Sequence, residues 1–323
     1  MDLSVVIPVY GCSGTLRPLH ERLGRALSAL VERYEIIFVD DRGLDNSWAI
    51  LQELAAGDPH VIACRLSRNF GQQIAITAGL EQSRGERVVV MDCDLQDPPE
   101  AIEKLVEAAD RGFDIVFAKR RTPFRPAVRS IGSRLYFRLL SLLSGSAIDD
   151  ELGAFSLVSR RVVEAFLKFR ERDRLYMLIL HWLGFETTTI EYDRDVRAVG
   201  NSSYSIGKLI ALGLSGMFFM TTRLLHWVVY AGLALAGSSC LLALYFIIHW
   251  FLAGPVAGWT SLIVVQLLVG GLIILCVGIA ALYIGKIFEA SQQRPLYILQ
   301  DRIDGSEQAT PAETDSAAAG PGA

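Results

Sequence analysis

The residues best suited to chemistry follow a short apolar run in the stretch ERVVVMDCDLQDPPE, residues 86–100. The run suits a buried strand, and it stops at Asp92 and Asp94, with a further carboxylate at Asp97. Two carboxylates separated by one residue at a strand end can bind Mg²⁺ or Mn²⁺, because hard cations take oxygen ligands. Such an ion would neutralise a diphosphate and stabilise it as a leaving group. On its own, the pattern is more often a solvated acidic turn.

Alternating strand and helix patterns surround this stretch and predict an α/β domain. The strand patterns cover residues 3–10, 35–41, 61–67 and 87–92, and the helical patterns cover residues 15–34, 45–57 and 72–85. This order is typical of a mostly parallel sheet with covered faces, in which ligands bind beyond the carboxyl ends of the strands. Asp40 and Asp41 end the second strand, as Asp92 and Asp94 follow the fourth. Both acidic pairs therefore fall where a ligand is expected.

Composition and short motifs exclude several classes of protein. The net charge of −4 does not favour a nucleic-acid-binding protein, and the G-x-G-x-x-G and G-x-x-x-x-G-K-[ST] motifs are absent. The start, MDLSVVIPVY, lacks the regions of a signal peptide, so the N-terminal part is expected in the cytoplasm. The cysteines show no CxxC pair and no metal-ligand spacing, and we expect free thiols in a reducing compartment. They are Cys12, Cys64, Cys93, Cys240 and Cys276.

Two long apolar segments in the C-terminal part predict a membrane anchor. Residues 224–252 and 260–285 each exceed the roughly 20 apolar residues needed to cross a bilayer, and neither contains Asp, Glu, Lys or Arg. Basic residues outside the pair place both ends in the cytoplasm by the positive-inside rule. Residues 205–223 fit an interfacial helix. We therefore expect an integral membrane protein with two spans, whose catalytic domain and both termini are cytoplasmic.

The predicted domain organisation follows from these segments. It consists of a catalytic domain at 1–204, an interfacial helix at 205–223, a transmembrane hairpin at 224–287 and a cytoplasmic tail at 288–323, disordered after about residue 304. The apolar segments contain small residues, as in GLALAG and GGLIILCVG, that allow helices to pack closely. Copies of the chain could therefore associate as a homo-oligomer.

Several motifs together resemble the family 2 glycosyltransferases, which have the GT-A fold. SVVIPVY resembles the opening strand of the family, IIFVDDRGLDNSW its V-D-D-G-S-x-D-x-S motif, and RNFGQQIAITAGL its R-N-x-G-x-x-x-A-x-x-x-G motif. MDCDLQDPPE is similar to D-A-D-L-Q-D-P-P-E, and VRAVGNSSYSIGKL resembles R-x-x-G-x-S-x-Y-x-x-x-K-L. The subgroup that these motifs resemble is the polyprenyl-phosphate glycosyltransferases related to dolichol-phosphate mannose synthase. The resemblance implies a Rossmann-like, mostly parallel GT-A domain followed by interfacial helices and two transmembrane helices.

The resemblance also implies an activity and a set of site residues. It implies a membrane-bound inverting transferase that moves a sugar from a nucleoside-diphosphate sugar to a polyprenyl phosphate, undecaprenyl or dolichyl, on the cytoplasmic face. Asp92 and Asp94 would be catalytic residues that hold Mg²⁺ or Mn²⁺ and the diphosphate. An oxygen of the lipid phosphate would attack the anomeric carbon as the nucleoside diphosphate leaves. The residues implied for the nucleotide-sugar site are Pro8, Tyr10, Asp40, Asp41, Asp92 and Gln96.

Basic side chains provide candidates for the acceptor site. An anionic lipid headgroup beside an anionic donor requires cationic groups, and arginine suits bidentate contacts with phosphate. The helical pattern at residues 129–145 interleaves arginines with apolar residues and could lie on the membrane surface, although a solvated basic helix face has the same pattern. The candidates for the lipid phosphate are Lys119, Arg120, Arg129, Arg134, Arg197 and, from the motif beginning VRAVG, Ser202.

This chain departs from the family pattern at several positions of the site. Cys12 stands where the family often has a glutamate, Cys93 replaces an alanine, and Arg42 enters the donor-site motif. The acceptor-side motif G-D-F-R reads GAFS, so that the aspartate often proposed as base is Ala154, and Glu151 is its nearest catalytic substitute. A lipid phosphate is already ionised near pH 7, so that a strong base is barely needed.

Two rival interpretations remain at this level. A processive polysaccharide synthase would share the catalytic domain, but it is expected to carry a Q-x-x-R-W motif and more spans, which this sequence lacks. A degenerate domain that binds a sugar nucleotide or scaffolds a partner would explain Cys12 and Ala154. The intact pair Asp92 and Asp94 and the series of arginines argue against it.

Overall fold

The structure of this protein is a computed structural model, which describes residues 1–121, 152–169, 171, 174–193 and 258–308, together with scattered positions between 230 and 252. The chain divides into two compact units. Within the described ranges, the first unit is built from residues 1–121, 152–193 and 295–308, and the second contains the long helix α10 (Trp259–Ser291). The candidate functional residues that the structure describes belong to the first unit.

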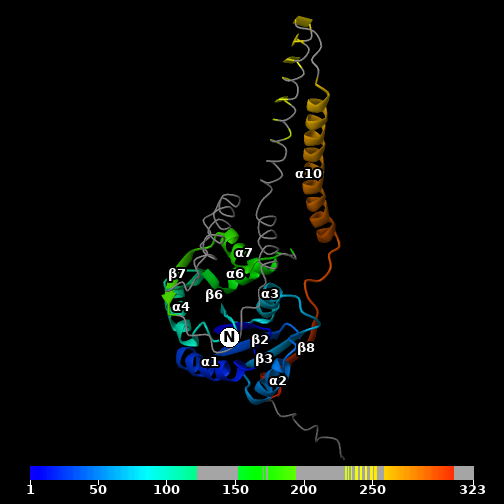
Figure 1. Cartoon of the computed structure of the whole chain (residues 1–323). Helices are drawn as coiled ribbons and strands as arrows, with labels where there is room; N and C mark the ends of the chain where they lie inside the picture. Colours follow the sequence, from blue (N-terminus) through cyan, green and yellow to red (C-terminus); the bar gives the residue numbers. More distant parts are fainter. Residues whose placement is uncertain are drawn as a thin grey trace, which may run out of the picture. The chain divides into compact units, whose positions relative to one another are not determined.

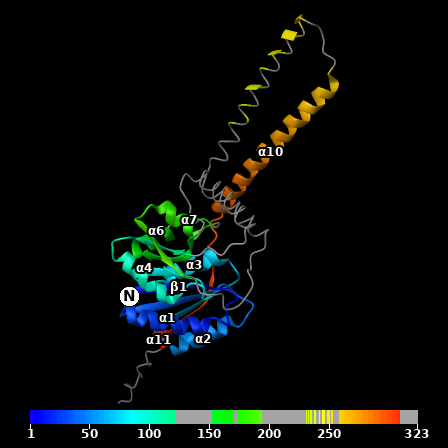
Figure 2. The same ribbon diagram turned by 60° about the vertical axis from the view of Figure 1, so that its left-hand side comes forward.

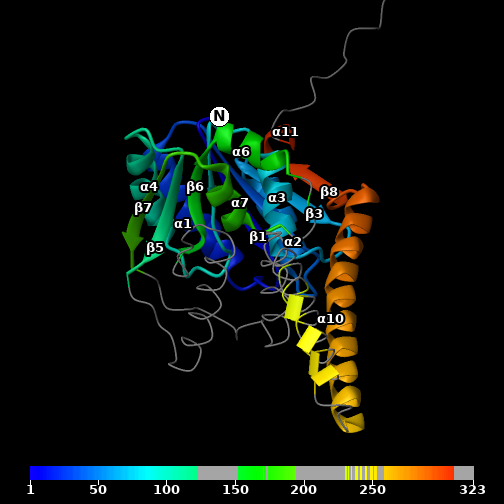
Figure 3. The ribbon, with the colours of Figure 1, turned by 90° about the horizontal axis from the view of Figure 1, so that it is seen from above.

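An eight-stranded sheet forms the centre of the first unit, in the order β7-β5-β6-β4-β1-β2-β3-β8. Figure 3 shows the strands side by side from β7 to β8. Four of the seven strand pairs are parallel, so that the predicted mostly parallel α/β sheet is confirmed. The strands are β1 (Leu3–Val9), β2 (Tyr34–Asp40), β3 (Val61–Leu66), β4 (Arg87–Val90), β5 (Ile115–Arg120), β6 (Leu152–Ser159), β7 (Thr187–Tyr192) and β8 (Leu299–Asp304).

Helices cover both faces of this sheet. One face packs on α1, α2 and α4, whose leucines and isoleucines join the same core cluster as the odd-numbered residues of β1. The other face packs on α3, with α6 and α7 beside it, and two views agree on this arrangement (Figure 1, Figure 2). The helices are α1 (Leu16–Leu30), α2 (Ser47–Gly57), α3 (Gln72–Gln82), the short 3-10 helix η1 (Pro99–Ala101), α4 (Ile102–Ala109), α6 (Arg160–Leu167) and α7 (Tyr176–Leu183).

Sequence periodicity explains why these segments fold as they do. In α1 the leucines at 16, 19, 23 and 27 recur at helical spacing, and all four are buried. The central strands β1 and β2 are buried at every residue, as expected for strands covered on both faces. The strands and helices predicted within residues 3–92 are all present, with ends that differ by no more than a few residues.

The strand β8 corrects the predicted domain boundaries. It lies outside the predicted 1–204 domain, in the segment predicted to be a tail, yet it pairs antiparallel with β3 and completes the sheet. The short helix α11 (Gly305–Gln308) follows it directly, so that the predicted disorder does not begin at residue 304. β3 therefore has a partner on both sides, and β8 is the edge strand at this side of the sheet.

The predicted membrane segments lie partly outside the described residues. The predicted interfacial helix at 205–223 lies wholly outside them, and the first predicted span is described only at scattered positions. The second predicted span falls within α10, an uninterrupted helix of 33 residues. Of the helices in the described part of the chain, none meets the combined criterion of length and hydropathy for crossing a membrane.

Candidate active site

The carboxyl ends of six strands, β1, β2, β3, β4, β5 and β7, lie at the same end of the sheet. β1, β2 and β4 are parallel neighbours, and β5 and β7 run in the same direction because β6 is antiparallel to both β4 and β5. In the sheet, β2 and β3 follow on one side of β1, whereas β4 lies on the other side of β1. The strand order therefore reverses between β1 and β4. Ligands of open α/β sheets bind in the crevice at such a reversal.

The crevice that such a reversal predicts would begin where β1 and β4 stop pairing. Their register ends at Val6 and Val90, and a last backbone bond joins the N–H of Met91 to the carbonyl of Val6 at 3.1 Å. Residue 8 faces the same side of β1 as Val6, because backbone groups alternate along a strand. Pro8 has no N–H to leave unpaired there. Its position explains how a proline is accommodated in a central strand.

Asp92 and Asp94 follow the last bond between β1 and β4 directly in the chain. The side-chain amide of Gln72, at the start of α3, donates to Asp92 Oδ1 at 2.7 Å. Asp94 Oδ1 accepts the backbone N–H of Gln96 at 3.1 Å, which shapes the turn that presents both carboxylates. Burial, together with the charges of Asp97 and Asp94, raises the pKa of Asp92 to about 7. A cationic ligand would relieve this concentration of negative charge.

A hydrogen-bonded network from the neighbouring strands supports the acidic turn. The hydroxyl of Tyr192, at the end of β7, donates to Oδ1 of the buried Asp97. Arg120, at the end of β5, donates from Nε to the same hydroxyl at 3.3 Å, and its charge acts on both Asp92 and Asp97. Burial and Asp97 raise the pKa of Tyr192 well above its usual value, so that the phenol remains a donor. Arg120 therefore faces the acidic turn, at the edge of the site where the acceptor is expected.

The second acidic pair, at the end of β2, divides into two roles. Asp41 accepts the backbone N–H groups of Phe70 at 2.7 Å and Gly71 at 2.8 Å, so that it fixes the loop that leads into α3. Asp40 accepts the N–H of Gly43 at 3.2 Å, and burial raises the pKa of its carboxyl. Asp40 is only 1% exposed, and its Oδ2 lies 3.2 Å from Nε of Arg65. Both acidic side chains therefore have partners within the protein.

Contacts join the loop after β1 to the loop after β2, and the loop after β2 to β8. The N–H of Ser13, after β1, donates to Asp45 Oδ2 at 2.9 Å, which ties the first loop to the second. Arg42 adopts a left-handed backbone conformation, with φ of 57°, and its guanidinium donates to Gln300 Oε1 of β8 at 2.7 Å. Tyr10, at the start of the first loop, is 50% exposed.

The cysteines correct another prediction. Cys12 and Cys93, predicted to be free thiols, form a disulfide with a Cα–Cα distance of 6.3 Å. Their separation of 81 residues hides the pair from a search for short cysteine motifs. Two other described cysteines, Cys64 and Cys276, are free as predicted, and Cys240 lies outside the described residues.

The acceptor side is described only in part. Ala154 lies near the amino end of β6, at the same edge as the acidic turn, and it offers no titratable group there. Ser156 is buried and its hydroxyl lies 3.0 Å from the hydroxyl of Tyr176. Lys119 and Arg120 lie on β5. The remaining predicted acceptor-site and catalytic residues, Arg129, Arg134, Glu151, Arg197 and Ser202, lie outside the described residues.

Sequence reasoning missed three residues of this edge. Gln72 stands within the RNFGQQIAITAGL motif, and its place at the start of the third helix was the available signal. Tyr192 ends an edge strand, and nothing in its local sequence connects it with Asp97. Gln300 lies in a segment that was predicted to be a tail, so that its contact with the donor-site loop could not be predicted.

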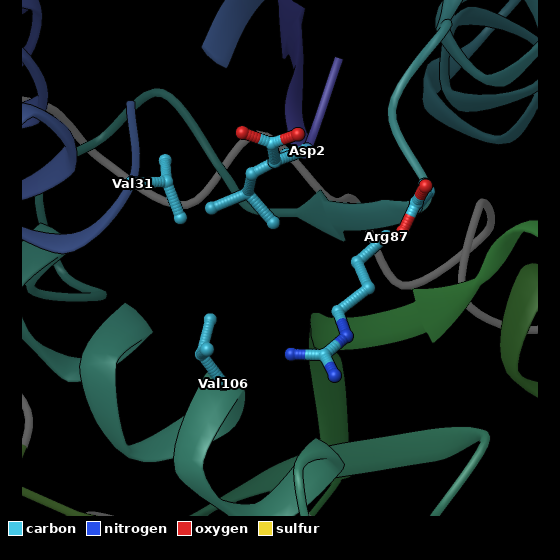
Figure 4. A pocket seen from close by; sticks show the side chains of 6 residues that line it. Asp2, Val31, Arg87 and Val106 are labelled. Carbon is cyan, nitrogen blue, oxygen red and sulfur yellow. The ribbon is translucent and has the colours of Figure 1, made fainter. Parts of the chain in front are cut away.

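A cavity of about 190 Å³ lies at the opposite end of the strands (Figure 4). Asp2, Leu3 and Arg87 line it near the amino ends of β1 and β4, together with Val31, Glu86 and Val106. It contains none of the predicted site residues. Since ligands of parallel sheets bind at the carboxyl ends, this cavity is not the candidate active site.

The donor atoms at the acidic turn fit a hard divalent cation. Among the described residues, no group of three or more His, Cys, Asp or Glu side chains is arranged to hold a metal ion. Mg²⁺ needs no such cage, because it is usually held by one or two carboxylates together with water and substrate phosphates. The paired carboxylates of Asp92 and Asp94 meet that requirement.

Comparisons with known proteins agree with this geometry. The profile of glycosyl transferase family 2 matches residues 4–167. The chain is 35% identical over 304 residues to YkcC of Bacillus subtilis, an uncharacterised glycosyltransferase, with 93% of this chain and 94% of that protein covered. It is 34% identical to the bactoprenol glucosyl transferase of Shigella phage SfV, with 93% and 99% covered.

A solved structure supports the fold. Mannosyl-3-phosphoglycerate synthase from Rubrobacter xylanophilus superposes with a TM-score of 0.50 at 16% identity, covering 67% of this chain and 71% of that one. This similarity concerns the fold alone and agrees with the GT-A-like sheet. With an acidic turn at the reversal of strand order and a family profile that matches half of its length, the chain belongs to glycosyl transferase family 2 and is a glycosyltransferase.

Proposed function

We propose that this protein transfers a sugar from a nucleoside-diphosphate sugar to a polyprenyl phosphate, with inversion at the anomeric carbon. The observation that carries the proposal is that Asp92 and Asp94 directly follow the point where β1 and β4 stop pairing, with the charge of Arg120 acting on Asp92. The name of the phage relative, a bactoprenol glucosyl transferase, supports a polyprenyl acceptor and makes glucose the first sugar to test.

Asp92 and Asp94 would hold Mg²⁺ or Mn²⁺. Such an ion, when bound, supplies positive charge that neutralises the donor diphosphate and improves it as a leaving group. Gln72 orients Asp92 through its hydrogen bond, and the N–H of Gln96 orients Asp94. These contacts fix both carboxylates before the donor arrives, which lowers the cost of ordering the site.

The remaining donor contacts follow from the exposed and buried groups of the crevice. The half-exposed ring of Tyr10 can stack on a nucleobase, because an aromatic face is apolar and accessible there. Asp40 would act on the donor site through the loop after β2, because it is buried, accepts the N–H of Gly43 and pairs with Arg65. Asp41 acts through the loop that it braces and does not need to touch the donor.

The acceptor reaction requires little from the protein beyond position. An oxygen of the lipid phosphate attacks the anomeric carbon, the bond to the diphosphate oxygen breaks, and the nucleoside diphosphate leaves with the bonding electrons. The phosphate is largely ionised near pH 7, so that no residue must remove a proton. The alanine at position 154, which cannot act as a base, is consistent with a reaction that needs none. Arg120 can hold the phosphate near the acidic turn, because guanidinium groups bind phosphate oxygens in pairs.

A membrane location is part of the proposal, because a polyprenyl acceptor is embedded in lipid. The sequence supports it, since residues 260–285 carry no charged side chain. The helical conformation of residues 259–291 and the exposure of Leu262, Ile274 and Phe288 also support it, because exposed large apolar side chains need an apolar environment. We propose two spans with a cytoplasmic catalytic domain.

Cysteines introduced at residues 254–258 and labelled with an impermeant maleimide in intact cells should react from outside, whereas labelling only after lysis would contradict this topology.

Transfer to undecaprenyl phosphate by the purified full chain tests the activity. We would supply UDP-, GDP- and dTDP-sugars, beginning with UDP-glucose, with Mn²⁺ or Mg²⁺ and with EDTA as control. We expect one donor to give a lipid-linked sugar that disappears with EDTA, and NMR should show a β-linked product from an α-linked donor. An α-linked product would contradict the single displacement.

A matched pair of variants tests the role of the acidic turn. Asp92→Asn removes one carboxylate from the acidic turn. Asp110→Asn removes one from the surface, where the carboxylate of Asp110 forms an ion pair with Arg87. We expect Asp92→Asn to lose transfer while still binding the lipid, and Asp110→Asn to retain it. Transfer by Asp92→Asn at the normal rate would show that the metal site lies elsewhere. Donor binding without transfer by the unmodified protein would favour a degenerate binding domain.

A further inference from the structure

The disulfide joins the two loops that flank the crevice. Cys12 lies three residues after β1 and Cys93 lies three residues after β4, on either side of the point where the strand order reverses. Cys93 also stands between the two carboxylates of the acidic turn. Both cysteines are departures from the family motifs, and the structure brings these two departures into one contact. Their Cα–Cα distance of 6.3 Å is within the range that a disulfide bridges without backbone movement.

We propose that Cys12–Cys93 is a thiol–disulfide modification site that controls the affinity for the nucleoside-diphosphate part of the donor. The proposal rests on the proposed function, because it assigns a donor to this crevice. The oxidised protein holds the loop at residues 10–13 against the acidic turn. The reduced protein releases that loop and binds the nucleotide more weakly.

The bond acts on the groups that would contact the donor. Tyr10, the exposed aromatic residue of the first loop, is two residues from Cys12. Gly11 between them has φ of 69°, a conformation that glycine adopts readily, so that without the cross-link this turn has many accessible alternatives. Fixing the loop before the nucleotide arrives removes an ordering cost from binding.

Non-covalent contacts set an upper limit on the effect. The hydroxyl of Thr15 donates to the backbone carbonyl of Cys93 at 2.6 Å and lies 3.0 Å from the backbone carbonyl of Cys12. The N–H of Ser13 also donates to the carboxylate of Asp45. The reduced loop therefore keeps part of its order. We expect reduction to weaken nucleotide binding by about tenfold, which corresponds to about 1.4 kcal/mol.

The chemistry of the switch is thiol–disulfide exchange. A thiolate of a small dithiol or of a redox protein attacks Cys12 Sγ, the Cys12–Cys93 bond breaks, and Cys93 leaves as a thiolate that takes up a proton. A second thiol of the reductant then resolves the mixed disulfide, so that two thiols form on the protein and one disulfide forms on the reductant. Attack at Cys12 is favoured by access, because Cys12 is partly exposed and Cys93 is only 6% exposed.

The other described cysteines are not suited to this reaction. Cys64 is buried in β3, and burial raises the pKa of its thiol to about 12, so that it stays protonated and unreactive. Cys276 lies in α10, in the second unit, and has no cysteine partner among the described residues. A Cys276→Ser variant therefore serves as a matched control that removes a thiol without touching the switch.

The experiment measures the bond and the affinity separately. Non-reducing peptide mapping of the full chain should recover the peptides of Cys12 and Cys93 as one linked species, and dithiothreitol should separate them. Calorimetry then measures the binding of UDP, GDP and dTDP, each with Mn²⁺, to the oxidised and the reduced protein. We expect the nucleotide that binds best to bind about tenfold more weakly after reduction. Cys276→Ser should show the same difference, and Cys93→Ala should bind like the reduced protein under both conditions.

Several outcomes would overturn the inference. Absence of the linked peptide under oxidising conditions, equal affinities in the two states, or a redox effect that persists in Cys93→Ala would each contradict it. Failure of all three nucleotides to bind the oxidised protein would also contradict it. The transfer assay tests the proposed function separately. If the protein transfers sugar to undecaprenyl phosphate in both redox states but binds the nucleotide equally well in both, the switch is contradicted and the proposed function is not. Loss of transfer from every donor in both states would instead contradict the proposed function.

Discussion

Removing the hydroxyl of Tyr192 tests whether the network behind the acidic turn is part of the active site. Tyr192→Phe deletes one oxygen, which donates to the buried carboxylate of Asp97 and accepts from Arg120 at 3.3 Å. The ring can keep its place against Phe155, from which its centroid is 5.4 Å away. The variant therefore changes hydrogen bonding with little change in packing.

The expected magnitude follows from the charge and burial of Asp97. A hydrogen bond to a charged group contributes about 1.5–3 kcal/mol, and Asp97 would lose one donor while remaining buried. We expect Tyr192→Phe to lower the free energy of unfolding by about 2 kcal/mol, or the melting temperature by about 4–8 °C. Arg120 would also lose a fixed partner and turn toward Asp97, away from Asp92. We expect the transfer rate at saturating donor to fall about tenfold, equivalent to about 1.4 kcal/mol in the barrier.

A second tyrosine provides the control. Tyr176 is equally buried, and its hydroxyl lies 3.0 Å from that of Ser156, a neutral partner. Tyr176→Phe should cost about 1 kcal/mol of stability and leave the transfer rate within twofold. Thermal melts give the stabilities, and transfer to undecaprenyl phosphate gives the rates. If both variants transfer at the normal rate, or if both lose activity in proportion to stability, Tyr192 has no specific role in the reaction.

Three further predictions concern other parts of the first unit. Burial and neighbouring carboxylates raise the pKa of Asp92 from 3.8 to about 7, so that the folded protein without metal binds a proton more tightly than the unfolded chain. Its free energy of unfolding should therefore fall as the pH rises from about 4 to about 7. Thermal melts at pH 5–8 should show this loss without Mn²⁺ and its reversal with Mn²⁺. In Gly79→Ala the new Cβ would lie 2.2 Å from Val6 Cγ1, so that the free energy of unfolding measured in urea should fall by about 1–3 kcal/mol. In Gly24→Ala the new Cβ has no neighbour within 4 Å, and the same free energy should rise by up to about 1 kcal/mol. Equal effects of the two variants would contradict the packing of α3. Asp41→Asn should cost about 1–3 kcal/mol because one oxygen can no longer accept a backbone N–H, and unchanged urea unfolding would show that this brace is unimportant.

The sequence predicted those parts of the fold whose signals are local. Short apolar runs located the strands up to β4, helical periodicity located the helices between them, and strand ends located both acidic pairs, because residue types and spacing determine these features. The position of Asp41 shows the limit of this reasoning. It was predicted to bind nucleotide from its place in a motif, and this stays a prediction. The hydrogen bonds of its two oxygens with the N–H groups of Phe70 and Gly71 are a contact that only the folded chain shows.

Long-range pairings could not be predicted from local patterns. The disulfide of Cys12 with Cys93 and the hydrogen bond of Tyr192 with Asp97 connect residues that are 81 and 95 positions apart. Each depends on which strands become neighbours in the sheet, and that order is not encoded in the periodicity of any single strand. The acceptor residues predicted from basic patterns, apart from Lys119 and Arg120, lie outside the described residues and stay predictions.

The pairing of β8 with β3 has a consequence for how the chain is made. Arg42 and Gln300, which meet across this side of the sheet, are separated by 258 residues. A ribosome adds about 5–20 residues per second, so that roughly 10–50 s pass between the synthesis of the two. From the synthesis of β3 until that of β8, the edge of β3 has no partner, and an unpaired strand edge can recruit strands from other chains. A truncated chain that ends at residue 204 would keep this edge open permanently, so that a catalytic fragment made for expression should carry residues 295–308 as well.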